Sequence, residues 1–223
     1  MTPPHWLVLA AGALAGGYLV GTIPVAWLVV RRGRGVDLRT AGRGRAGTLD
    51  ALVVGGVRAA ALTIVLELIK GAAVGLGARV YDGDAWFAAT AIAGCVVGDA
   101  FPVGIRRGRR GAVPLVSGVV AALPSAWWAG VIIALPAVVL LGLRGRAFEQ
   151  VVALCVPLGL LVGTRDLRTL APAAIIVVAL IARHRVRARE QRRQAERWGA
   201  LGAPGGVPLV VEPPPRPGSV PRP

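Results

Sequence analysis

A single lysine stands inside a hydrophobic segment of a chain whose other basic residues are arginines. Lys70 lies within residues 59–80, and the chain has 26 Lys and Arg residues in total. The lysine ammonium is a compact point charge suited to binding a phosphate group. Ionisable side chains at membrane depth are costly, and by default they mark a functional site. Lys70 is therefore the first candidate for chemistry.

Two acidic residues can act with this lysine. Glu67 lies three residues before Lys70, so the two can share a helix face and form an ion pair. In a second interpretation, which stays open here, Lys70 extends its ammonium to the membrane interface and Glu67 is only its partner. Asp99 lies inside the next hydrophobic segment, where a carboxylate opposes phosphate binding unless an arginine pairs with it.

Two basic, glycine-rich loops could bind phosphate. Glycines let backbone N–H groups converge on an anion, and arginines bind phosphate through paired hydrogen bonds. The second loop directly precedes a short predicted helix, whose dipole would add to the binding. Such loops also serve as ordinary cytoplasmic connections, so both interpretations stay open. The candidate phosphate-binding residues are Arg39, Gly42, Gly44, Arg45 and Gly47 in the first loop and Gly108, Arg109, Arg110 and Gly111 in the second.

The composition indicates an integral membrane protein. Of 223 residues, 55% are hydrophobic and 17% charged, and the mean hydropathy is +0.64. The net charge of +15 comes from short arginine runs between apolar segments, a pattern of membrane topology rather than of a nucleic-acid interface. Cys95 and Cys155 both lie in apolar stretches and match no metal-binding or disulfide pattern. We therefore expect no nucleic-acid partner, no metal and no cofactor.

The fold class predicted is an all-α, polytopic bundle of about seven transmembrane segments. Pro24 should kink or end the first of them, and the fourth is short enough to be a half-helix. With the N-terminus outside and the C-terminus inside, only Arg79, Arg165 and Arg168 fall in outer loops, in agreement with the positive-inside rule. The predicted segments are residues 6–30, 59–80, 85–105, 112–123, 127–143, 148–162 and 167–182.

Two domains are predicted. Residues 1–198 form the membrane domain, which ends in a helix over residues 183–197 whose charges suit anionic lipid headgroups. Residues 199–223 are rich in Pro and Gly, so they form a disordered cytoplasmic tail.

The order of motifs resembles the acyl-phosphate:glycerol-3-phosphate acyltransferases of the PlsY type. The resemblance covers residues 21–124 and part of the C-terminal region, with near-matching spacing throughout. The motifs that carry it are Gly21-Thr-Ile-Pro24, Gly35-Val-Asp-Leu-Arg39, the glycines Gly42, Gly44 and Gly47, Glu67-Leu-Ile-Lys-Gly71, Gly98-Asp-Ala-Phe-Pro-Val103, Gly108-Arg-Arg-Gly111, Ser117-Gly-Val-Val-Ala-Ala-Leu-Pro124 and Arg183-His-Arg185.

This resemblance implies a multi-pass enzyme of the plasma membrane whose active face is cytoplasmic. It would move a fatty acyl group from acyl phosphate to glycerol 3-phosphate and yield lysophosphatidic acid for phospholipid biosynthesis. Its substrates and the membrane lipid would be its partners. Lys70 and His184 would be catalytic, with Arg39 and the 109–110 arginines as cationic clamps and Glu67 and Asp99 in support. His184 can also be read as an interfacial residue among arginines.

Several motif positions differ from the family pattern. Arg43 and Arg45 replace a serine and an asparagine, Asp99 replaces a histidine, and Arg187 replaces an asparagine near the C-terminus. An alternative is therefore a catalytically silent homologue that binds anionic lipid or a phosphorylated metabolite, or that partners an active enzyme. An unrelated transporter or scaffold is a third possibility, although we find no internal repeat of the kind transporters show.

Overall fold

The computed structural model is built from helices throughout the residues that it describes, which are 5–41, 47–102, 112–141, 155, 158–160 and 162–200. No strand occurs among them, which confirms the all-α prediction. The chain separates into two compact units, Met1–Arg185 and Val186–Pro223, and the candidate site lies in the first. Residues 201–223 lie outside the described residues, so the disordered tail and the domain boundary remain predictions.

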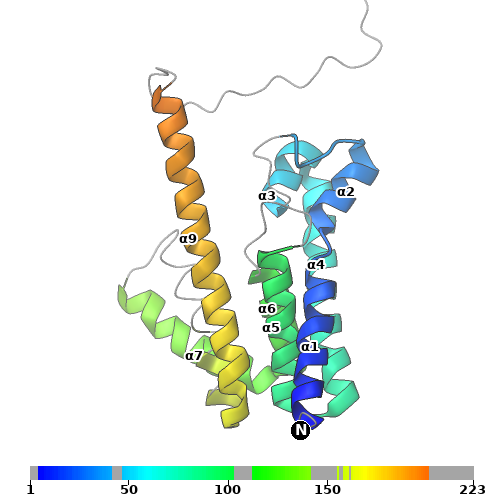
Figure 1. Cartoon of the computed structure of the whole chain (residues 1–223), viewed down its shortest axis with the longest axis vertical. Helices are drawn as coiled ribbons and strands as arrows, with labels where there is room; N and C mark the ends of the chain where they lie inside the picture. The colour runs from blue at the N-terminus through cyan, green and yellow to red at the C-terminus, as the bar shows by residue number, and fades with distance from the viewer. Residues whose placement is uncertain are drawn as a thin grey trace, which may run out of the picture. The chain divides into compact units, whose positions relative to one another are not determined.

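Figure 1 shows the helices of the described residues, coloured in chain order. A five-residue π-helix leads directly into the longest helix of the first unit, and a 3-10 turn precedes the last helix. In order they are α1 (His5–Gly21), α2 (Val25–Arg34), α3 (Thr48–Asp50), η1 (Ala51–Gly55), α4 (Gly56–Asp82), α5 (Ala85–Ala100), α6 (Ala112–Ala122), α7 (Pro124–Leu141), η2 (Leu167–Thr169) and α9 (Leu170–Ala200).

Prolines end two of the predicted segments early. The first segment is broken between α1 and α2 at Thr22–Pro24, as expected for a proline that cannot continue the hydrogen-bond ladder. The third segment was predicted to run to residue 105, but α5 ends at Ala100. Phe101 there has φ −133° and ψ 64°, because Pro102 disfavours a helical conformation in the residue before it.

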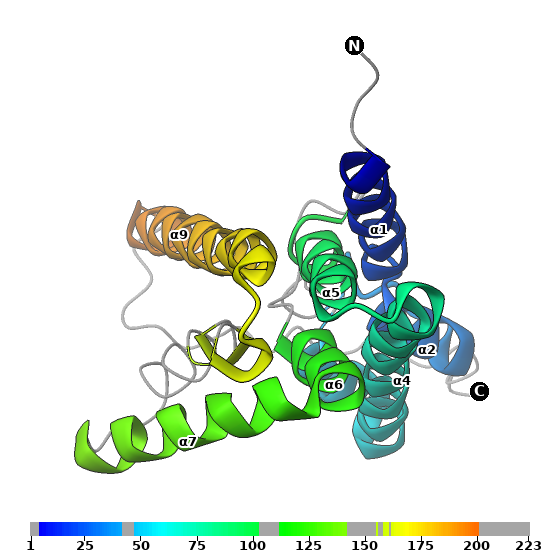
Figure 2. The ribbon, with the colours of Figure 1, turned by 90° about the horizontal axis from the view of Figure 1, so that it is seen from below.

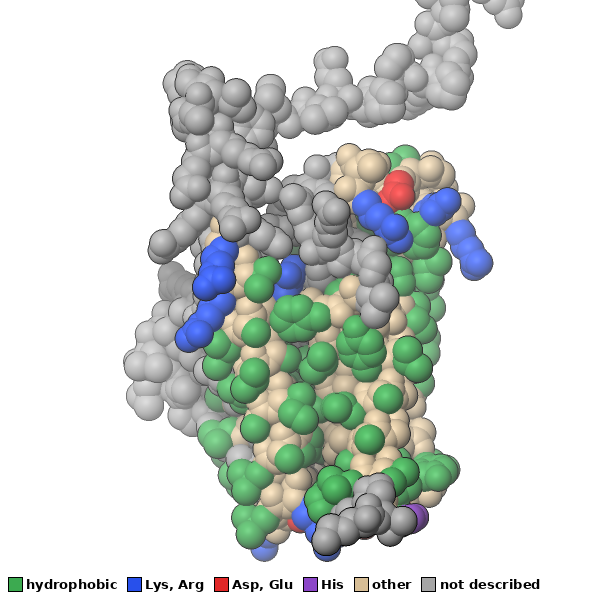
Figure 3. All heavy atoms as spheres, viewed as in Figure 1, with side chains coloured by type: hydrophobic (Ala, Val, Ile, Leu, Met, Phe, Trp, Pro, Cys, Tyr) green, Lys and Arg blue, Asp and Glu red, His purple; other side chains and the backbone are tan. Residues whose placement is uncertain are grey.

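Two helical stretches of the described chain, His5–Arg34 and Thr48–Asp82, are long and apolar enough to span a membrane. The α5 helix is apolar but shorter, and Leu115–Ala122 is bent by 120° from Pro124–Ile132, the geometry of a broken span or of a re-entrant loop. In Figure 3, hydrophobic side chains cover the middle of the visible face, and Lys and Arg side chains lie toward its ends. The number of crossings and their orientation remain predictions.

Small residues let α1 and α5 lie backbone against backbone. A Cβ added at Gly17 or Gly21 of α1 would overlap the carbonyl oxygen of Ala91 or Cys95. A Cβ added at Gly94 or Gly98 of α5 would overlap α1 in the same way. Membrane helices associate through this kind of close packing, because lipid supplies no hydrophobic driving force. The glycines therefore bring the C-terminal ends of both helices together.

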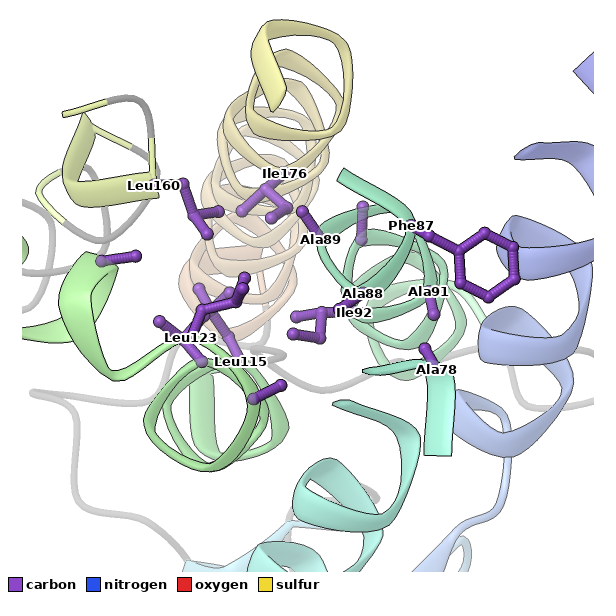
Figure 4. Close-up of a cluster of buried hydrophobic side chains, with 14 of the residues drawn as sticks. Ala78, Phe87, Ala88, Ala89, Ala91, Ile92, Leu115, Leu123, Leu160 and Ile176 are labelled. Carbon is purple, nitrogen blue, oxygen red and sulfur yellow. The ribbon is translucent and has the colours of Figure 1, made fainter. Parts of the chain in front are cut away.

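The α5 helix lies at the centre of the first unit, between α1, α4 and α6 (Figures 1 and 2). Its core neighbours come from several elements: Ile92 packs among Leu115, Leu123 and Ile176 (Figure 4). By contrast, α4 exposes apolar side chains such as Val57, Leu62 and Val65. Such a face is what a lipid-contacting helix requires.

Candidate active site

The Lys70 ammonium has three acceptors inside the helix bundle. Its Nζ lies 3.2 Å from Glu67 Oε2, 3.2 Å from Asp99 Oδ1 and 3.3 Å from the carbonyl oxygen of Gly21. The Lys70 and Asp99 side chains are 5% and 3% exposed, and that of Glu67 is fully buried. An ammonium has three donors; two hydrogen bonds run from it to Asp99 Oδ1 and to the Gly21 carbonyl, and Glu67 adds an ion pair.

Three helices position this cluster. Glu67 and Lys70 are one turn apart on α4, Asp99 lies near the end of α5, and Gly21 is the last residue of α1. The final carbonyl groups of an α-helix have no partner within the helix, so the Gly21 oxygen is available to Lys70. The close α1–α5 contact, reinforced by a hydrogen bond from the Tyr18 hydroxyl to the Phe101 carbonyl, sets its place.

The predicted ion pair between Lys70 and Glu67 is present, and the lysine side chain is buried among three acceptors. Asp99, for which sequence analysis sought an arginine partner, pairs with Lys70 instead.

A second cluster surrounds Arg39 in the loop after α2. Asp37 Oδ1 accepts hydrogen bonds from Trp27 Nε1 and from the Arg39 backbone N–H, both at 2.8 Å. The Cζ atoms of Arg31 and Arg39 each lie 4.7 Å from the centre of the Trp27 ring. The hydrogen bond from the Arg39 backbone, with smaller contributions from Trp27 and both guanidinium groups, lowers the pKa of Asp37 below its usual value. Asp37 is therefore ionised at neutral pH.

An open, largely apolar cavity of about 670 Å³ lies between α1, α2 and α4. Its two cationic residues are Lys70 and Arg32. The other lining residues are Val20, Ile23, Val25, Leu28, Val29, Gly33, Leu62, Leu66 and Ile69. Such a cavity suits a ligand with a long apolar part and an anionic group.

Comparison with known proteins agrees with these features. The family model for glycerol-3-phosphate acyltransferases matches residues 11–193. This chain belongs to the glycerol-3-phosphate acyltransferase family. It is 31% identical to the glycerol-3-phosphate acyltransferase of Rubrobacter xylanophilus over 85% of this chain and 96% of that protein. It is also 31% identical to that of Brucella canis, over 91% of this chain and 98% of that protein.

The fold is that of an integral membrane acyltransferase of known structure. The crystal structure of PlsY in its glycerol 3-phosphate form matches with a TM-score of 0.65 and 24% identity, over 83% of this chain and 92% of that one. Its lysophosphatidic acid form matches with a TM-score of 0.64 and 22% identity. The resemblance and the membrane fold expected from the sequence are thereby confirmed.

Within this acyltransferase fold, the structure brings together only some of the predicted site residues. Lys70, Glu67 and Asp99 form one cluster, whereas Arg39 belongs to the Trp27 cluster and does not line the cavity. Gly47 directly precedes α3, and His184 lies in α9, where its side chain is not described. The predicted residues Gly42, Gly44, Arg45, Gly108, Arg109, Arg110 and Gly111 lie outside the described residues.

Three groups around the candidate site were not predicted from the sequence. The role of the Gly21 carbonyl could not be predicted from the sequence, because every residue carries a backbone carbonyl group. Arg32 lines the cavity but stood among many interchangeable arginines. Trp27 could have been found, since it precedes Arg31 by four residues and the two therefore share a helix face.

Proposed function

We propose that this protein transfers a fatty acyl group from acyl phosphate to the 1-hydroxyl of glycerol 3-phosphate, releasing lysophosphatidic acid and inorganic phosphate. Family membership supports this reaction, as do relatives named glycerol-3-phosphate acyltransferase. The structural observation that carries it is the apolar cavity with Lys70 and Arg32 among its lining residues. An acyl phosphate combines a long apolar chain with an anionic head, and both parts find matching surface there.

The reaction needs no acyl-enzyme intermediate. The glycerol oxygen forms a bond to the acyl carbon, the bond from that carbon to the phosphate oxygen breaks, and the hydroxyl proton ends on the released phosphate. Two phosphorylated substrates repel each other, so cationic side chains that hold both would supply much of the rate. We assign this role to Arg39 and to the arginines at positions 109 and 110, with the loop glycines completing the phosphate sites.

Lys70 and His184 are proposed as the catalytic residues. Lys70 adjoins the cavity, where its ammonium would favour the developing negative charge if the substrate replaced one of its acceptors. Glu67 and Asp99 support it by holding the ammonium in place. His184, near the cytoplasmic end of the membrane domain, would accept or return the hydroxyl proton. We also propose that the protein resides in the plasma membrane, with this site on the cytoplasmic side.

One observation favours a second candidate function. The Lys70 ammonium hydrogen-bonds to Asp99 and the Gly21 carbonyl and forms an ion pair with Glu67. A lysine held in this way can be purely structural, and the chain would then be a silent family member that binds anionic lipid or a phosphorylated metabolite. Product formation by the purified protein distinguishes the two candidates.

Arg39→Gln should lower kcat/KM for glycerol 3-phosphate about 30-fold, because it removes a charge-assisted hydrogen bond to phosphate. The measurement is the rate of labelled lysophosphatidic acid formation from palmitoyl phosphate in lipid vesicles. Arg168→Gln, a matched change at an exposed arginine in a predicted outer loop, should retain the wild-type rate. Equal rates for the two variants would show that Arg39 does not bind substrate phosphate.

A further inference from the structure

The Trp27 side chain, on α2, contacts the loop that carries Arg39. Its Nε1–H donates to Asp37 Oδ1 at 2.8 Å, and its ring lies under the guanidinium groups of Arg31 and Arg39, each 4.7 Å from the ring centre. The same Asp37 oxygen accepts from the Arg39 backbone. One indole therefore contacts both arginines and the carboxylate that binds the Arg39 backbone N–H.

The contacts of Trp27 with Asp37, Arg31 and Arg39 are supported by a packed core. Trp27 packs against a small core of Ala26, Val30, Leu38 and Ala51, each fully buried. Gly35 adopts the left-handed conformation, with φ 69°, which ends α2 and lets the chain turn back toward Trp27. Residues 36–39 are thereby held against α2, and the position of Arg39 is defined at both its backbone and its side chain.

The stacking leaves both arginines suited to binding an anion. An aromatic ring covers one flat face of a guanidinium, while the N–H groups at its edge remain able to donate. Within the part of the chain that the structure describes, neither Arg31 nor Arg39 forms an ion pair with a carboxylate. Asp37 Oδ1 accepts from the indole and from the Arg39 backbone, so this carboxylate orders the loop, and its charge offsets part of the charge of the two arginines.

We propose that Trp27 is a positioning residue that holds Arg31 and Arg39 together as a binding site for a substrate phosphate monoester. This inference rests on the proposed function, because it assigns a phosphorylated substrate to the site. Trp27 touches no reacting atom. It acts by restricting the side-chain conformations of the two arginines before phosphate binds, so that less conformational entropy is lost on binding.

Trp27→Leu tests this proposal in the full-length protein. We expect KM for glycerol 3-phosphate to rise about fivefold with little change in kcat, because a ring–guanidinium contact of this strength is lost. Trp27→Phe keeps an aromatic ring but loses the Nε1–H donor to Asp37, so its KM should lie between those of wild type and Trp27→Leu. Trp128→Leu is the matched control, since Trp128 of α7 is 63% exposed and lies outside the proposed site.

A double-mutant cycle separates positioning from a general structural role. Once Arg39 is Gln, the further change Trp27→Leu should add less than about twofold to the loss, because the two residues act as one unit. Independent, multiplying effects would overturn the proposal. So would a Trp27→Leu enzyme whose KM equals that of wild type.

A binding measurement keeps this test independent of turnover. Glycerol 3-phosphate should raise the thermal midpoint of the wild-type protein, and Trp27→Leu should reduce that shift while Trp128→Leu should not. If wild type makes no product but shows this pattern, the proposed reaction fails and the phosphate site stands. If glycerol 3-phosphate shifts neither wild type nor variant, the inference itself is wrong.

Discussion

Lys70→Met is expected to destabilise the protein by about 3–5 kcal/mol, the cost of removing one partner from a buried ion pair. The change leaves the Glu67 and Asp99 carboxylates facing a position that no longer holds their shared cation. It also leaves the Gly21 carbonyl without its lysine donor. The unfolding midpoint in detergent, by heat or by denaturant, should fall accordingly.

A compensated variant provides the control for this prediction. Adding Glu67→Gln and Asp99→Asn to Lys70→Met removes the carboxylate charges, and the midpoint should recover in part. If Lys70→Met alone unfolds at the wild-type midpoint, the cluster does not stabilise the bundle. A Lys70 variant that loses turnover shows a catalytic role for Lys70 only if the variant protein is also shown to be folded.

Gly21→Ala is expected to cost about 1–3 kcal/mol of stability and to abolish most activity, because overpacking forces backbones apart. The added Cβ would overlap the Cys95 carbonyl of α5 and move the Gly21 oxygen away from Lys70. Gly16→Ala is the matched control on the same helix, since a Cβ there meets nothing within 4 Å.

The measurements are the unfolding midpoint and the acyl transfer rate of both variants. Gly16→Ala should match wild type in each. A Gly21→Ala protein with wild-type stability and rate would show that α1 and α5 need not approach so closely for the site to form.

Local patterns in the sequence were sufficient to predict most of the described helices and one ion pair. Apolar runs located the helical segments, Pro24 located the break between α1 and α2, and the three-residue spacing of Glu67 and Lys70 predicted their contact. These features depend on residues close together in the chain. The end of α5 was misplaced because Pro102 was not weighed against the apolar run around it.

The rest of the cluster depends on contacts between distant parts of the chain. Asp99 reaches Lys70 across 29 residues, and Gly21 does so across 49, through a backbone oxygen. The close approach of α1 and α5 places the Gly21 oxygen and Asp99 beside the Lys70 ammonium. That approach depends on glycines, which have no side-chain group that would indicate a site. A search for paired charged side chains therefore finds Glu67 but not the arrangement that buries Lys70.

Acyl transfer by the purified wild-type protein in lipid vesicles tests the central claim most directly. The donor is palmitoyl phosphate, the acceptor is labelled glycerol 3-phosphate, and palmitoyl-CoA serves as a comparison donor. We predict labelled lysophosphatidic acid that requires the acyl phosphate, with a rate that Arg39→Gln lowers and Arg168→Gln does not. Absence of product from protein with a cooperative unfolding transition would contradict the proposed reaction and favour the silent, ligand-binding homologue.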